Sequence, residues 1–127
     1  MAYTTIDDPS AYFHTQLYTG TGSELSVTNG ANAGDFKPDW IWIKQRNAVT
    51  NHGMFDSTRG VKKNLKTDTT DAESTENESV KTFNTDGFTL GTSGDYNGSS
   101  DTHVAWQWKA NGGTTSTNTA GTNIDTT

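Results

Sequence analysis

The sequence predicts an all-β domain, an antiparallel β-sandwich of jelly-roll type. Apolar residues gather in a few short blocks, and the segments between these blocks are rich in Thr, Ser, Asn, Gly and Asp. The four tryptophans form two pairs with a spacing of two, which places both members of a pair on one face of a strand. The most informative blocks are PDWIWIK (38–44), DSTRG (56–60), DGFTLG (86–91) and VAWQWKA (104–110).

Length and composition fit one domain with a modest core. The chain has 127 residues, of which 29% are hydrophobic and 10% aromatic, and the large area of each aromatic ring offsets the low apolar content. The net charge of −6 argues against nucleic acid as a partner, because such binding draws on clustered Lys and Arg. There is no cysteine, so disulfides and thiolate metal sites are excluded. No apolar run is long enough to insert into a membrane.

Residues 1–14 are predicted to form an N-terminal docking arm. Asp8 and Pro9 could cap a short helical turn, or this stretch could be extended. Tyr12 and Phe13 are adjacent aromatics in a polar segment, so we expect them to anchor the arm in an assembly.

The first half of the predicted sandwich, which spans residues 15–110, begins with strands at 15–19 and 24–28. The Gly-rich turn between them favours a hairpin. The segment 39–45 is the strongest strand, and both of its faces are apolar. It should therefore be central, with one face on the core and the other covered.

Short strands are expected next at 53–56 and 61–65, followed by a long acidic loop at 67–78. The segments 80–83 and 88–90 should form a hairpin, because Asp-Gly is a strong turn signal.

A second polar loop at 92–102 precedes the last strand, 103–109. In that strand Trp106 and Trp108 are expected to face the core, with His103 and Gln107 on the other side. Residues 111–127 have little to bury and are predicted to be a polar linker or tail.

The blocks occur in an order that resembles a known family. They are LYTGTG (17–22), PDWIWIKQR (38–46), DSTRG (56–60), FNTDGFTLG (83–91) and VAWQWKA (104–110). This order is similar to the concanavalin/laminin-G-like β-sandwich domains of structural proteins in marine bacteriophages, and the resemblance runs from the N-terminus to about residue 111. It implies a virion structural or host-adsorption role, and it supplies no catalytic residues.

Oxygen-bearing side chains alternate in the second polar loop, at Asp95, Asn97, Ser99 and Asp101. Ca²⁺ accepts carboxylate and carbonyl oxygens at flexible angles, so these residues are a speculative calcium site. The EF-hand pattern fails, because no Glu stands at the twelfth position. An ordinary polar turn is the alternative.

Catalytic constellations are weak in this sequence. The three histidines, His14, His52 and His103, show no metal-ligand spacing. Ser57 with His52 and Asp56 lacks the strained turn and oxyanion partner of a nucleophilic triad, so we reject it. A pair of carboxylates for glycoside cleavage stays open, since any two acids can meet in space. We expect no enzyme.

Two further side-chain roles are predicted. Trp40 and Trp42 could line a platform that stacks on pyranose rings of a host polysaccharide. Arg59 should pair with Asp56 and hold the turn of the DSTRG block.

The sequence and the resemblance together give a functional hypothesis. The chain is expected to be a virion structural protein of a tail fibre, an adsorption appendage or a surface decoration, working as a homo-oligomer in host attachment. Its partners would be copies of itself, other virion proteins and host surface polysaccharide. The loops 67–78 and 92–102 would face the host, while 1–14 and 111–127 dock on the particle. The alternative is a carbohydrate-binding module.

Overall fold

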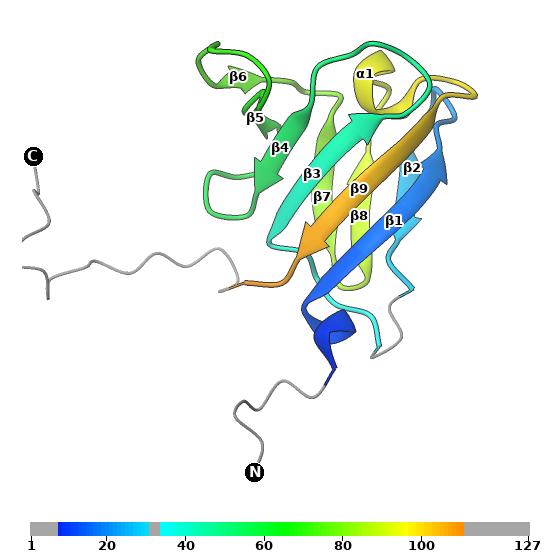
Figure 1. Cartoon of the computed structure of the whole chain (residues 1–127), viewed down its shortest axis with the longest axis vertical. Helices are drawn as coiled ribbons and strands as arrows, with labels where there is room; N and C mark the ends of the chain where they lie inside the picture. Colours follow the sequence, from blue (N-terminus) through cyan, green and yellow to red (C-terminus); the bar gives the residue numbers. More distant parts are fainter. Residues whose placement is uncertain (1–7, 31–33, 111–127) are drawn as a thin grey trace, which may run out of the picture.

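The computed structural model describes residues 8–30 and 34–110, and within them it forms three antiparallel sheets (Figure 1). The chain is nearly all β and sandwich-like, as predicted. The four-stranded sheet has the order β1 (Phe13–Thr19), β9 (Thr102–Trp108), β3 (Trp40–Gln45), β4 (Gly53–Asp56). The three-stranded sheet has the order β2 (Leu25–Thr28), β8 (Gly87–Leu90), β7 (Val80–Asn84), and β5 (Lys63–Asn64) pairs with β6 (Ser74–Thr75).

The hydrophobic core lies between the four-stranded and the three-stranded sheet. Ile41, Ile43 and Phe55 enter it from one sheet, and Phe88 and Leu90 enter it from the other, all with no exposed surface. Their burial removes apolar area from water on both inner faces, which is the main force that holds two sheets together. Strand β3 is an inner strand, as its two apolar faces predicted. The expected cover over its second face is wrong for the described residues, because Trp40 and Trp42 on that face are partly exposed.

The predicted hairpin of 15–19 with 24–28 is wrong. β1 pairs with β9, and β2 pairs with β8, so the turn between β1 and β2 crosses from one sheet to the other. Gly20 is needed at this crossing, because a Cβ there would stand 2.2 Å from the carbonyl oxygen of Gly98. The close approach of two backbones, and not a hairpin turn, explains the glycine.

The hairpin of β7 and β8 is confirmed, with Asn84 opposite Gly87 at its end. Gly87 also permits the neighbouring pairing of β8 with β2. A Cβ at this position would lie 2.0 Å from the carbonyl oxygen of Val27. One glycine therefore serves both the turn and the sheet.

The N-terminal segment differs from the prediction at its boundary. A 3₁₀ turn, η1 (Pro9–Ala11), is capped by the Asp8 carboxylate, which accepts a hydrogen bond from the Ser10 amide. Phe13 and His14 then belong to β1 and not to an arm. The predictions for residues 1–7 and for the tail 111–127 fall outside the described residues.

The two polar loops lie at one end of the sandwich. The loop 92–102 contains the short helix α1 (Gly94–Asn97), and the acidic loop contains β6. Figure 1 shows α1, β5 and β6 at the upper end, and η1 and the end of β9 at the lower end. In the ranges that the structure describes, no helix has the length and apolarity to cross a membrane.

Candidate functional site: the aromatic outer face

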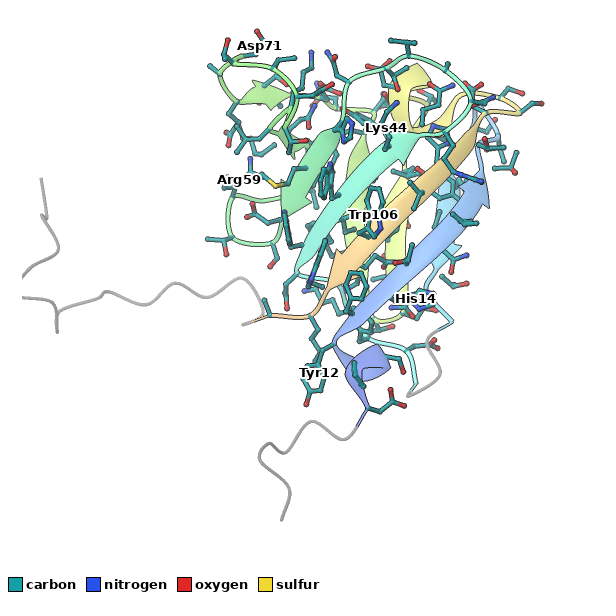
Figure 2. All side chains as sticks on the ribbon, in the orientation of Figure 1. Tyr12, His14, Lys44, Arg59, Asp71 and Trp106 are labelled. Carbon is teal, nitrogen blue, oxygen red and sulfur yellow. The ribbon has the colours of Figure 1, made fainter. Side chains whose placement is uncertain are left out.

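The four tryptophans lie on the outer face of the four-stranded sheet. Exposure alternates along β3 and along β9 from Ala105 onward: Ile41, Ile43 and Ala105 are fully buried, whereas all four Trp side chains are partly exposed. In Figure 2, Trp106 lies in front of the sheet, on the side away from the three-stranded sheet. The prediction that Trp106 and Trp108 face the core is therefore wrong.

Alternation in the last strand fits either orientation, and the neighbours decide between them. With Ile41 and Ile43 pointing inward on β3, the residues of β9 that share this face are His103, Ala105 and Gln107. Isoleucine is often fully buried, whereas tryptophan seldom is. That difference is the sequence signal that would have found the correct face.

The tryptophans form two cross-strand pairs. Trp40 is in register with Trp108 and Trp42 with Trp106, and the ring centroids are 4.1 Å and 5.2 Å apart. Phe13 on β1 extends the series, with its ring 4.9 Å from that of Trp108. We call these five residues the aromatic face. Such pairs are the usual stabilising unit of a sheet surface, and the rings shield one another from water.

Polar side chains in and around the aromatic face find their hydrogen-bond partners within the fold. The indole nitrogen of Trp42 donates a hydrogen bond of 3.1 Å to Nδ1 of His52. Lys44 donates to the carbonyl oxygens of Gln45 and Ala48. Because these polar groups have partners within the fold, the face is preorganised, and its rings are tilted to one another by 30° to 49°.

At the β1 side the face continues into exposed apolar residues. Tyr12, Phe13 and Leu17 are 42%, 38% and 53% exposed. The ammonium of Lys109 stands 5.8 Å from the ring centroid of Tyr12, which is within cation–π range. Phe13, one of the two predicted assembly residues, therefore belongs to the aromatic face, whereas Tyr12 precedes β1 and contacts Lys109.

Asp39 joins the first and last blocks to the DSTRG block. Its carboxylate accepts a hydrogen bond from the Ser57 hydroxyl at 2.9 Å and another from the Ala110 amide at 2.8 Å. Its backbone carbonyl accepts from the Ser57 amide. These bonds hold the start of β3, the end of β4 and the end of β9 together beneath the aromatic face.

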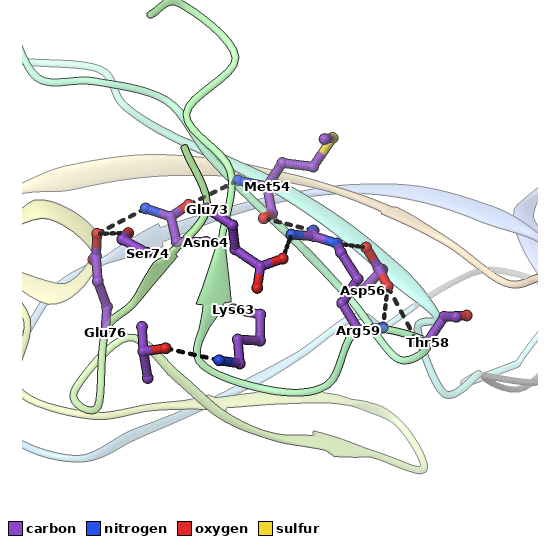
Figure 3. A network of polar contacts seen from close by, with 10 residues as sticks. Met54, Asp56, Thr58, Arg59, Lys63, Asn64, Glu73, Ser74 and Glu76 are labelled. Atoms are coloured by element: carbon purple, nitrogen blue, oxygen red, sulfur yellow. Dashed lines mark hydrogen bonds and ion pairs between the residues drawn. The ribbon is translucent and has the colours of Figure 1, made fainter. Parts of the chain in front are cut away.

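Arg59 organises the edge beside β4 (Figure 3). Its Nε pairs with the Asp56 carboxylate, which confirms the predicted ion pair, and its Nη1 lies 3.0 Å from a Glu73 carboxylate oxygen. Its Nη2 donates to the Met54 carbonyl. Glu73, in the acidic loop, was not expected here. The guanidinium thus ties the loop 67–78 to the sheet.

The proposed calcium ligands have varied surroundings. Asn97 is fully buried, and its amide nitrogen donates to the carbonyl oxygens of Ser23 and Gly91. Its side-chain oxygen accepts from the Thr21 amide, so Asn97 holds the crossing between β1 and β2. Asp95 and Ser99 are exposed and Asp101 is half-buried. Calcium binding by these residues stays a prediction.

The histidines are spread over separate parts of the fold. His52 contacts Trp42, and His14 contacts Gln16. His103 is fully buried in the core, where burial lowers the pKa of its imidazole. Within residues 8–30 and 34–110, no three His, Asp or Glu side chains gather in a geometry that would hold a metal ion, and no pocket is found.

Comparison with known proteins gives a family without a described activity. A family model described as "domain of unknown function (DUF7483)" matches residues 8–127. Neither the curated proteins nor the solved structures include a significant match.

Proposed function

The chain belongs to the DUF7483 family, and we propose that this member is a virion structural protein that acts by binding and assembly. It would be a component of a bacteriophage tail fibre, adsorption appendage or surface decoration. The resemblance of its ordered blocks to domains of marine phage structural proteins supplies the context. The mechanism that we propose is recognition by the rigid surfaces of the sandwich, without chemistry.

One observation carries the proposal: a preorganised aromatic surface on the outside of the sandwich. A free-standing domain normally packs its tryptophans against its core or scatters them over its surface. A large contiguous apolar patch on the surface therefore marks an interaction site. Here all four are on the outer side of one sheet, beside exposed Phe13 and Leu17. Aromatic residues are also the type most enriched in interfaces.

The arrangement of loops and chain ends gives independent support. The polar loops containing α1 and β6 lie at the end of the sandwich opposite to residues 8 and 110, where the described chain ends (Figure 1). A module of this shape can be attached at one end and present loops at the other. Loops held by a rigid scaffold are the usual carriers of recognition.

The direct test is mass spectrometry of density-gradient-purified particles from the culture that produces this protein. We expect its peptides in the particle fraction, at a copy number comparable to other appendage proteins. Immunogold labelling should then mark one location on the particle. Presence of the chain only in the soluble fraction of lysed cells would overturn the proposal.

Glycan recognition is a second candidate, and the partial exposure of Trp40 and Trp42 on the outer face favours it. A pyranose ring would stack on an indole as base rings do in nucleic-acid platforms. A glycan array decides it, with the wild type, Trp42→Ala and, as the control, Val49→Ala at a fully exposed loop residue. Binding lost only in Trp42→Ala supports the candidate, and binding by neither wild type nor variants rejects it.

A further inference from the structure

We propose that the free edge of β1 pairs with β1 of a second copy of this chain. The two four-stranded sheets would then join across a two-fold axis into one antiparallel sheet. This inference rests on the assembly role proposed above and names the surface that performs it.

The hydrogen-bond register shows which backbone groups of β1 are free. The amide of Lys109 donates to the carbonyl of Tyr12, and the amide of Gly20 donates to the carbonyl of Asp101. Since facing residues alternate in an antiparallel ladder, the even-numbered residues of β1 point their backbone groups toward β9. Those of Phe13, Thr15, Leu17 and Thr19 point to the opposite edge, where β1 has no partner strand among the described residues.

The other sheet edges are guarded. Met54 on β4 exchanges two backbone hydrogen bonds with Leu65, at 3.0 Å and 3.1 Å, so that edge is covered. β7 has an irregular register between Val80 and Thr82, and it carries Lys81. β2 is only four residues long. Bulges, lysines, short strands and covering segments are the devices by which natural sheets prevent edge pairing.

β1 has none of these devices. It is seven residues long, with a regular register to β9, and contains no proline and no charged side chain. In a chain with a net charge of −6, an uncharged edge is the place where two copies approach with least repulsion. The free edge therefore favours a second copy as its occupant.

Side chains on the edge are self-complementary. In a two-fold antiparallel register centred on Thr15, each Phe13 would stand opposite Leu17 of the second copy. Both residues are exposed in the single chain, at 38% and 53%. Aromatic–aliphatic cross-strand pairs are stabilising, and the aromatic faces of the two copies would become continuous.

A single side chain now occupies the edge. The side-chain amide nitrogen of Gln16 donates a hydrogen bond of 2.8 Å to the backbone carbonyl of Leu17, one of the outward-pointing groups. In the paired state the amide N–H of Phe13 from the second copy would replace it. The exchange substitutes one hydrogen bond for another, so it presents only a small cost.

The test is the molar mass of the full chain in solution, measured by light scattering and sedimentation over a range of concentrations. We expect a dimer for the wild type and monomers for Thr15→Lys and Thr15→Glu, because like charges would face each other at the axis. Each charge should weaken association, raising the Kd of the dimer by about tenfold or more, and mixing the two variants should restore the dimer. Thr28→Lys, an exposed strand position in the other sheet, is the matched control and should stay dimeric.

Amide hydrogen exchange gives a second readout that does not depend on variants. Amides of Phe13, Thr15, Leu17 and Thr19 should be protected in the wild type at high concentration and exchange faster on dilution. A wild-type monomer throughout, or a dimer that Thr15→Lys and Thr15→Glu leave intact with these amides unprotected, overturns the inference. If the chain is monomeric in solution but present in purified particles, only this pairing is overturned. If it is dimeric in solution but absent from particles, only the proposed function is overturned.

Discussion

The inner face of the four-stranded sheet mixes aliphatic and polar side chains, whereas the outer face carries all four tryptophans. The inner face buries Gln45, His103 and Gln107 completely or nearly so, while the outer face carries the four largest apolar side chains. The inner face is thus partly polar and buried, and the outer face is largely aromatic and partly exposed to solvent. The comparison teaches that the fit between the two sheets selects the inner residues, and hydrophobic area alone does not.

Stacking explains how the outer face tolerates its tryptophans. Each indole covers a neighbour across the β3–β9 ladder, so both rings lose water contact without entering the core. On the inner face, Tyr18 lies parallel to the His103 ring at 5.0 Å and donates its hydroxyl proton to the Tyr96 carbonyl. The two faces achieve stability by different means, and the following experiments separate them.

The largest effect is expected from truncation on the inner face. Phe55 is fully buried and its ring stands 5.4 Å from that of Tyr96 in an edge-to-face arrangement. Phe55→Ala should lower the free energy of unfolding by about 3–5 kcal/mol through lost burial and a cavity. Urea unfolding measures this. Leu17→Ala on the outer face is the control and should cost less than about 1 kcal/mol. Equal losses would contradict the assignment of faces.

Removing a polar group from the inner face should stabilise the protein. Neither side-chain polar atom of Gln107 has a hydrogen-bond partner, and the residue is fully buried. Gln107→Met keeps the length and should raise the free energy of unfolding by about 1–2 kcal/mol. Gln45→Met is the matched control, because Gln45 donates to Asn47 and should gain nothing. A loss of stability in Gln107→Met would show that a partner exists.

Acid should destabilise the inner face through His103. Burial lowers the pKa of its imidazole below the ordinary value of 6.5; nearby Asp95 and Asp101 oppose this shift, although neither ring nitrogen makes a hydrogen bond of good geometry. Since the folded state favours the neutral ring, this contribution to stability is complete above pH 6.5. It is lost as the pH falls from there toward the lowered pKa.

The measurement is urea unfolding at several pH values for the wild type and His103→Gln. Below pH 6.5, the free energy of unfolding should depend less steeply on pH in His103→Gln than in the wild type. His14 and His52 remain in both proteins, so the difference in slope belongs to His103. Identical slopes would contradict the role of His103.

The smallest effect on stability, but a clear spectroscopic one, is expected on the outer face. Two indole pairs with centroids 4.1 Å and 5.2 Å apart should give an exciton couplet in circular dichroism. Trp108→Phe and Trp106→Phe should each remove about half of it. Iodide should quench the fluorescence, since all four indoles are partly exposed. Emission that iodide does not reach would place the tryptophans inside.

The sequence allowed prediction of most strands and of the turn chemistry, but not of β6, which lies in a predicted loop, nor of two long-range choices. β3, β4, the β7–β8 hairpin and the Arg59–Asp56 pair depend on local signals, such as alternation, Asp-Gly and a spacing of three. The pairing of Phe13 with Trp108 joins opposite ends of the described chain, and no local pattern records it.

The candidate site was only half predicted for the same reason. The spacing of two predicted that Trp40 and Trp42 share one face of their strand, and that Trp106 and Trp108 share one face of theirs. It gave no sign of which face points to the core. That sign depends on the second sheet, whose Phe88 and Leu90 fit against Ile41 and Ile43. Alternation fixes which residues share a face, and packing between distant segments decides where the face points.

The pairing of β1 with β9 has a mechanical consequence. Phe13 lies opposite Trp108, so the described chain enters β1 and leaves β9 at the same corner of the sheet. A pull applied to residues 8 and 110 in opposite directions would act across these two strands, and it would open their hydrogen bonds one after another. At that corner the Ala110 amide is held by Asp39, and Lys109 is held by Tyr12. Under tension, strands β1 and β9 should therefore separate one hydrogen bond at a time from this corner. The contacts of Ala110 and Lys109 set the force at which the separation begins.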